Sequence, residues 1–165
     1  MAKDDISDVL ISELIDMPKT IQNPNARAKV DGRHWKIDYS VHSTDGRYEF
    51  ALFTRQSTRL ATSYSAGLRW LRRDAESVML MRCNGSSHEH TNAIEGSVMA
   101  YECHIHIATE RYLSEGRRDE GYAEATGAYN DLRGALLELV TRCHIDGLKT
   151  ASGRPFDAQL GLDLQ

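Results

Sequence analysis

The sequence predicts an α+β fold, in which an antiparallel sheet of about five strands carries an N-terminal helix and C-terminal helices on one face. Between residues 30 and 108, hydrophobic side chains recur at every second position in several short segments, which is the period of a half-buried strand. Before and after this region they recur every three or four residues, as in amphipathic helices. Links of hairpin length between the segments favour antiparallel pairing.

The first element is predicted to be a helix that Asp5 caps and that ends at Met17-Pro18. Its apolar stripe consists of Ile6, Val9, Leu10 and Leu14. Residues 19–29 are polar and contain Pro24, so we expect a connector without regular structure there.

Three strands are expected next, each with a polar and an apolar side. The first starts at Val30 and alternates His34, Lys36, Asp38, Ser40 and His42 with Trp35, Ile37, Tyr39 and Val41. Asp45-Gly46 is a hairpin signal that leads to the second strand, residues 47–55, with Arg55 on its polar side and Tyr48, Phe50 and Leu52 on its apolar side. The third strand, residues 63–72, places Arg69 opposite an apolar side made of Tyr64, Ala66, Leu68 and Trp70.

Residues 77–83 are almost continuously apolar, which predicts a strand covered on both faces, and Arg82 is the charged residue within it. A polar loop to Ser97 follows and carries His88-Glu89-His90. In the fifth predicted strand, residues 98–108, the polar side carries Glu102, His104 and His106, and the apolar side carries Met99, Tyr101, Cys103, Ile105 and Ile107. Both strand histidines are therefore expected on the polar face.

Small and apolar residues recur at helical spacing between residues 119 and 144, which predicts one or two helices with a break near Gly127. We expect residues 1–146 to form a single α+β domain, because this length suits one hydrophobic core. Residues 147–165 read as a polar C-terminal tail that is either loose or docked at a sheet edge.

The composition argues against a membrane or secreted protein. The chain has 165 residues, of which 41% are hydrophobic, but no apolar run approaches the roughly 20 residues that cross a bilayer. The N-terminus lacks the charged and then apolar order of a signal peptide, so we expect a cytoplasmic protein. Cys83, Cys103 and Cys143 are far apart and odd in number, and we expect reduced thiols.

The net charge of -4 hides an asymmetry along the chain. Residues 26–83 contain eleven Lys and Arg against six Asp and Glu. Arginine outnumbers lysine by fifteen to five, which favours bidentate contacts to phosphate or carboxylate groups. This segment fits a nucleic-acid-binding face, and it equally fits an ordinary solvated face of a sheet.

Four of the seven histidines lie in two pairs, His88-Glu89-His90 and His104-Ile105-His106. Imidazole titrates near neutral pH and binds transition metals, so this concentration marks a candidate site. If the helices cover the apolar face of the sheet, the opposite face collects the strand histidines together with three arginines, Arg55, Arg69 and Arg82.

Three functions fit such a face. In the first, His88, His90, His104 and His106 bind zinc or another divalent metal, with Glu102 as a further ligand. A His-x-His pair on a strand can present both imidazoles to one ion.

In the second, the protein cleaves RNA without a metal. His104, His106 and His90 supply the acid and the base, and Arg82 stabilises the charged phosphorane. Arg55 and Arg69, with Glu102, would contact the RNA or DNA. We favour a protein that binds or acts on nucleic acid, with toxin-like RNA cleavage as one form of this.

In the third, the protein performs no chemistry and its polar face binds a protein partner, as a phage anti-defence inhibitor would. A second copy of the chain, giving a homodimer, is one such partner. Arginines and aromatic side chains suit the centre of a protein interface.

The stretch 80–123 resembles the central signature of a family of small, uncharacterised bacterial and prophage proteins. The resemblance is carried by Leu80-Met81-Arg82-Cys83-Asn84-Gly85, His88-x-His90-x-Asn92, His104-Ile105-His106-Ile107, Tyr112 and Tyr122-Ala123. The chain departs from it at Ser86-Ser87 and Ala93-Ile94. The resemblance implies an accessory or mobile-element role, toxin-like or anti-defence, and implies a site that includes Asn92.

Overall fold

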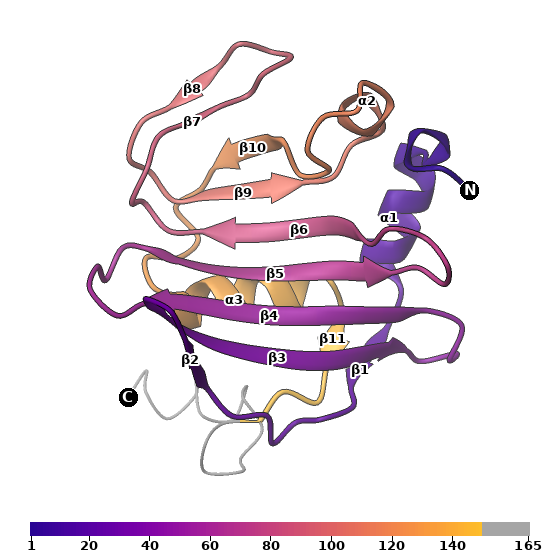
Figure 1. Cartoon of the computed structure of the whole chain (residues 1–165), viewed down its shortest axis with the longest axis horizontal. Coiled ribbons are helices and arrows are strands. Elements are labelled where there is room, and N and C mark those ends of the chain that lie inside the picture. Colours follow the sequence, from indigo (N-terminus) through magenta and orange to yellow (C-terminus); the bar gives the residue numbers. More distant parts are fainter. Residues whose placement is uncertain (150–165) are drawn as a thin grey trace.

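The computed structural model describes residues 1–149 and shows one large β-sheet with a helix lying along one of its faces (Figure 1). The helices in this part of the chain are α1 (Asp8–Asp16), α2 (Glu110–Ser114), α3 (Leu132–Arg142) and a 3-10 helix at Lys3–Asp5. The strands are β1 (Lys19–Ile21), β2 (Lys29–Asp31), β3 (His34–Ser43), β4 (Glu49–Ser57), β5 (Tyr64–Leu71), β6 (Val78–Asn84), β7 (His90–Thr91), β8 (Val98–Met99), β9 (His104–Ile107), β10 (Tyr122–Ala125) and β11 (Ile145–Asp146).

Within residues 1–149, nine strands form one sheet in the order β10-β9-β6-β5-β4-β3-β1-β11, with β2 paired to β3. The pairs are antiparallel except for β1 and β11, which run parallel. β7 and β8 form a separate two-stranded hairpin. The α+β class and the mostly antiparallel sheet are confirmed, but about five strands was too few, because β1, β2, β10 and β11 are too short to show a periodic pattern.

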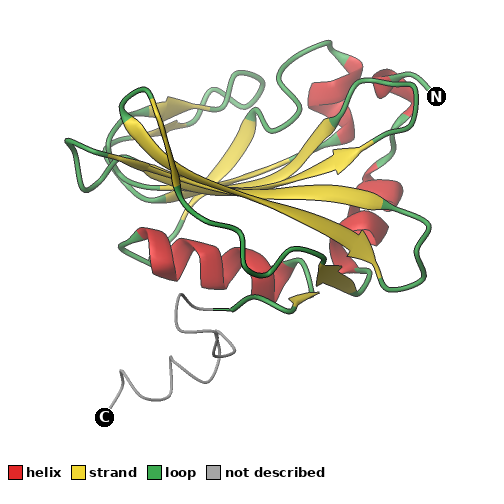
Figure 2. Ribbon diagram, turned by 60° about the horizontal axis from the view of Figure 1, so that its bottom comes forward, coloured by secondary structure: helices red, strands yellow, loops and turns green. Residues whose placement is uncertain are grey.

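The hydrophobic core lies between the sheet and α3, which packs across β4, β5 and β6 and is seen below the sheet in Figure 2. From β4 and β5 it receives the alternate residues Phe50, Leu52, Tyr64, Ala66, Leu68 and Trp70, all of which are buried. Helix α3 contributes Ala135, Leu136, Leu139 and Val140. The predicted apolar sides of both strands are therefore confirmed. Trp35 was expected there as well, but it lies near the end of β3 and is 48% exposed.

Helix α1 begins later than expected. Ser7, rather than Asp5, is the N-cap, and its Oγ accepts a hydrogen bond from the N–H of Leu10. Asp5 instead closes the preceding 3-10 turn. Ile6, Ile11 and Leu14 are buried, but Val9 of the predicted stripe is 69% exposed. At about 3.6 residues per turn, Val9 lies on the side of the helix opposite Ile11. The helix ends at Asp16, as predicted from Met17-Pro18.

The connector predicted at residues 19–29 contains a strand and a buried lysine. The ammonium group of Lys19 donates hydrogen bonds to the carbonyl oxygens of Ile15 and Met17 over 2.8 Å, and of Cys143 over 2.9 Å. The ammonium group thus caps the C-terminal ends of both α1 and α3, where carbonyl groups lack partners within the helix. Lys19 is 1% exposed, and burial lowers its pKa to about 8.

The fifth predicted strand, residues 98–108, is in fact two strands with different partners. β8 pairs with β7, whereas β9 pairs with β6 on one side and β10 on the other. The chain bends at Tyr101 between them. The alternation of Met99, Cys103 and Ile105 continues across this bend. An alternating pattern shows which residues share a face, but it does not show that the neighbouring strand changes. Glu102 therefore lies outside β9, and it is exposed.

The helices predicted between residues 119 and 144 are replaced in part by a strand. Tyr122 to Ala125 form β10, which pairs with β9 at the edge of the sheet. The hydrogen bonds that residues 122–125 form with β9 decide their structure, rather than the helical spacing of their apolar side chains. The helix itself starts only after Asp131, whose carboxylate accepts a hydrogen bond from the N–H of Gly134.

Beyond β11 the structure describes three more residues, of which Leu148 is buried. The predicted tail with Leu160, Leu162 and Leu164 lies outside the described residues. Among the described residues, the helices are too short or too polar to span a membrane. The three cysteines are free thiols, as expected. Cys83 and Cys143 are buried, but Cys103 is only partly buried.

Candidate functional site

The face of the sheet opposite α3 carries the polar residues of β6 and β9 next to one another. Arg82 on β6 lies directly across from His106 on β9, and Asn84 lies across from His104. Residues paired across neighbouring strands are within contact distance on the same face. The prediction that His104 and His106 project from the polar side of their strand is therefore confirmed. Both rings are nevertheless buried, with exposures of 0% and 3%.

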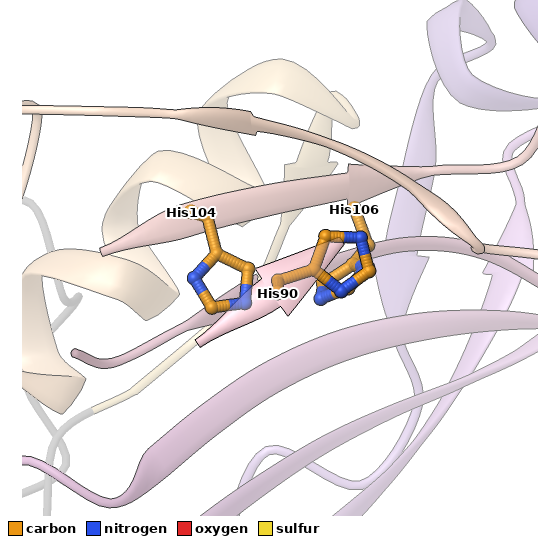
Figure 3. A group of neighbouring side chains, drawn as sticks. All are labelled: His90, His104 and His106. Carbon is orange, nitrogen blue, oxygen red and sulfur yellow. The ribbon is translucent and has the colours of Figure 1, made fainter. Parts of the chain in front are cut away.

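The imidazole of His90 joins these two rings and completes a compact group (Figure 3). Its ring centre lies 4.6 Å from that of His106 and 5.6 Å from that of His104. The rings of His104 and His106 are 4.9 Å apart. One ring nitrogen from each of the three lies within 4.8 Å of the others. We call His90, His104 and His106 the histidine triad.

His90 reaches the triad because the β7–β8 hairpin is fastened to the edge strand β10 through Asn92. The Oδ1 of Asn92 accepts a hydrogen bond from the N–H of Ala123 over 2.8 Å, and its Nδ2 donates to the carbonyl of Ala123 over 2.9 Å. These two bonds fix the orientation of the amide. Oδ1 also lies 3.1 Å from Nε2 of His90, which must therefore be the donor.

Each ring of the triad has one nitrogen held by a carbonyl oxygen. Nε2 of His90 donates to the carbonyl of Gly121 over 3.0 Å. Nδ1 of His104 donates to the carbonyl of Glu102 over 2.8 Å, and Nδ1 of His106 donates to that of Glu120 over 2.7 Å. A neutral imidazole has one donor and one acceptor nitrogen, so these bonds leave an acceptor lone pair on Nδ1 of His90 and on Nε2 of the other two.

Burial keeps the strand histidines uncharged at neutral pH. Burial, with Arg82 as the next contribution, lowers the pKa of His106 to about 2. The pKa of His104 is also lowered by burial, against the opposing effect of its bond to Glu102. The Nε2 atom of His104 has no hydrogen-bond partner among the described residues, although it is buried. Nε2 of His106 lies 3.3 Å from Nδ2 of Asn84.

Two residues of the predicted metal set do not belong to the triad. The ring of His88 lies 5.1 Å from that of His104, so it is a neighbour, but its own bonding is to Ser87, at 3.4 Å. The exposed side chain of Glu102 lies outside the group, and this residue contributes its backbone carbonyl alone.

The predicted arginines lie on the same face as the triad. Arg82, Arg55 and Arg69 line one shallow recess above β4, β5 and β6. Arg82 also pairs with the buried carboxylate of Glu120, 3.4 Å away. His34, at the start of β3, lies beside Arg55 and Arg82, whereas His42 pairs with Glu49 at the other end of β3.

Sequence reasoning missed Asn84, Glu120 and Gly121. Asn84 lies just beyond the predicted strand 77–83, at the start of the polar loop, but in the structure it is the last residue of β6. It is two residues from Arg82 and therefore shares its face. Glu120 and Gly121 hold the histidines through backbone carbonyls, which leave no signal in the residue type. The carboxylate of Glu120 also pairs with Arg82, but this contact joins segments that lie far apart in the sequence.

The fold and this site define an α+β protein with a group of three histidines, two of them fully buried, on the polar face of its sheet. A family model described as "Family of unknown function (DUF6978)" matches residues 6–145. The chain belongs to this family. Comparisons with curated proteins and with solved structures found no match.

Proposed function

We propose that the histidine triad binds a divalent transition metal, with zinc as the first candidate, and that the bound ion activates water for hydrolysis. The observation that carries this proposal is the hydrogen bonding of His90, His104 and His106. In each ring one nitrogen donates to a backbone carbonyl, so the other nitrogen carries the lone pair that can coordinate a metal. Metal-binding histidines characteristically have their second nitrogen held in this way.

The burial of His104 and His106 supports the presence of a metal ligand. An unpartnered buried polar atom such as Nε2 of His104 costs about 1–3 kcal/mol, and a metal ion would satisfy it. Metal binding also requires neutral imidazole, and the surroundings of His104 and His106 favour that form.

The spacing of the triad is compatible with an ion after a small movement. In a tetrahedral zinc site with bonds of about 2.0–2.1 Å, the ligand nitrogens lie about 3.3 Å apart. The three rings would close inward from separations of up to 4.8 Å, and the ion would replace the contact of Asn84 with His106. Three protein ligands leave one position for water, which is the pattern of catalytic zinc sites.

The test is metal analysis of the purified protein by mass spectrometry, followed by titration of the apo protein with Co²⁺. We expect about one ion per chain in the wild type, loss of the ion in His104→Ala, and retention in the control His42→Ala. His42 is on the same face of the sheet but outside the triad. Failure of the wild type to retain zinc or to bind Co²⁺ at micromolar concentration would contradict the proposal.

A second candidate is the metal-free cleavage of RNA. It is favoured by the position of His88, which borders a recess that also contains Arg55 and Arg82. Cleavage that persists in a chelator and is abolished in His88→Ala would select it over the metal-dependent reaction. If the protein neither binds a metal nor cleaves RNA, the remaining interpretation is a module that binds a protein partner.

A further inference from the structure

We infer that the recess beside the histidine triad binds a phosphate ester of a single-stranded nucleic acid, and that this ester is the substrate of the metal centre. The inference rests on the proposed function, because it names the substrate of that site. It is carried by the chemistry of the recess, by its distance from the triad and by its continuation across the sheet.

The recess has a volume of about 230 Å³ and is rich in donors that suit an anion. Arg55 and Arg82 supply guanidinium groups, Ser65 and Ser87 supply hydroxyls, and His34 and His88 complete its polar wall. The described residues that line it include no carboxylate. Arginine is the side chain best suited to bidentate contact with phosphate.

Two side chains in this recess have polar atoms that lack partners. Nε of Arg82 and Oδ1 of Asn84 are both buried, and neither has a hydrogen-bond partner among the described residues. Arg55 forms no ion pair with the described residues either. An anion would pair with Arg55 and with the Nε of Arg82, whose Nη1 already lies 3.4 Å from the carboxylate of Glu120. A hydroxyl of the same ligand could donate to Oδ1 of Asn84. Recesses with unsatisfied buried groups are costly unless a ligand or water fills them.

The pairing of the strands places this recess next to the triad. Arg55 lies opposite Ser65, Ser65 lies opposite Asn84, and Asn84 lies opposite His104. These four residues form one row across β4, β5, β6 and β9. Neighbouring strands are about 4.8 Å apart, so a phosphate held by Arg82 and Ser65 lies within reach of a water bound at the triad.

A second recess of about 330 Å³ continues the first and indicates more than one phosphate. It shares Arg55 and Arg82 with the first recess and extends to Arg69. Its far wall holds Lys36 and Asp38, which pair with each other over 3.7 Å. Arg69 forms no ion pair with the described residues. The three connected arginines, Arg55, Arg82 and Arg69, suit the repeating phosphates of a polymer better than a single nucleotide.

The reaction would be hydrolysis of a phosphodiester. The water at the metal gives up one proton to solvent, and its oxygen bonds to phosphorus. The P–O bond to the leaving sugar oxygen breaks, and that oxygen takes up one proton. Arg55 and Arg82 would stabilise the charge that gathers on the phosphoryl oxygens in the transition state.

The test measures binding by fluorescence anisotropy, with labelled eight-nucleotide single-stranded RNA and DNA as probes. Unlabelled oligonucleotide, mononucleotide and inorganic phosphate serve as competitors. The zinc-loaded protein is compared with Arg55→Gln, Arg69→Gln and the control Arg73→Gln. Arg73 lies in the turn before β6 and lines neither recess. Zinc content is measured on every sample, so that loss of the metal is distinguished from loss of nucleic acid.

We expect Arg55→Gln to weaken oligonucleotide binding about tenfold without changing zinc content, as when one charge-assisted hydrogen bond is lost. Arg69→Gln should weaken binding of the oligonucleotide but not of the mononucleotide, and Arg73→Gln should bind like the wild type. Equal binding by the wild type and Arg55→Gln would overturn the inference. Mononucleotide competing as well as the unlabelled oligonucleotide would overturn the assignment to a polymer.

Discussion

Asn92 pairs with Ala123 through its side chain in the way that a neighbouring strand would pair through its backbone. The amide accepts from the N–H and donates to the carbonyl of the same residue, over 2.8 and 2.9 Å. Because β10 is the edge strand of the sheet, these bonds fasten the β7–β8 hairpin to that edge. His90, two residues before Asn92, is thereby held at the triad.

Replacing Asn92 with Ala should therefore weaken both the fold and the metal site. It leaves two backbone groups of Ala123 unpaired in a buried position, and we expect unfolding to become easier by about 2–3 kcal/mol. Zinc affinity should fall by about 10–100-fold, as for other residues that orient a ligand. Urea unfolding and competition with a chelating dye measure the two effects. Ser97→Ala, which removes one acceptor of Asn92, is the milder control.

The metal-free protein should lose stability as the pH falls below 6.5. The pKa of His106 is about 2 in the folded chain, and about 6.5 is usual for unfolded histidine. The unfolded chain therefore binds a proton in this window that the folded chain does not bind, so stability from this group is complete above pH 6.5 and is lost towards pH 2.

For this group alone, the free energy of unfolding should drop by about 2–3 kcal/mol between pH 6.5 and pH 4.5. Urea titrations in the presence of a chelator measure the drop. His106→Gln, which cannot titrate, should show a correspondingly shallower pH dependence. Identical slopes in the two proteins would show that His106 does not carry this effect.

Lys19→Met should destabilise the protein by about 3 kcal/mol. The replacement keeps the apolar stem but leaves three carbonyl groups at the ends of α1 and α3 without their donor. Thermal unfolding followed by circular dichroism checks this. Lys36→Met is the matched control, because Lys36 is partly exposed and makes one long ion pair of 3.7 Å with Asp38. Similar losses in both variants would rule out the capping role of Lys19.

Tyr112→Phe should loosen the tip of the β7–β8 hairpin while the rest of the protein stays folded. The Tyr112 hydroxyl donates to the carboxylate of Glu95 over 2.7 Å and accepts from the N–H of Ile94 over 3.2 Å. Hydrogen exchange of residues 93–97 should accelerate in the variant, and exchange in β5 and β6 should not. An unchanged exchange rate at the tip would mean that the remaining contacts of Glu95 with Arg111 suffice.

The sequence was most informative where a strand is long and has one polar face. The alternation in β4 and β5 predicted which residues enter the core, and the His-x-His pair predicted that both rings share a face. It could not reveal that β9 pairs with β6, since the two strands are separated by the hairpin loop. The adjacency of Arg82 and His106 depends on that pairing. The burial of the rings depends on Asn92 and the hairpin, which are likewise contacts between distant segments.

Strand β6 sends Met81 and Cys83 into the core and presents Arg82 and Asn84 at the site, so the two roles alternate along four consecutive residues. A slip of this strand by a single position would bring a guanidinium group into the oily interior and turn a thiol towards the imidazoles. Such a slip would therefore disrupt the core and the histidine site together. Any copy of the chain that reaches a stable native state arrives with these two side chains already aimed at the histidines.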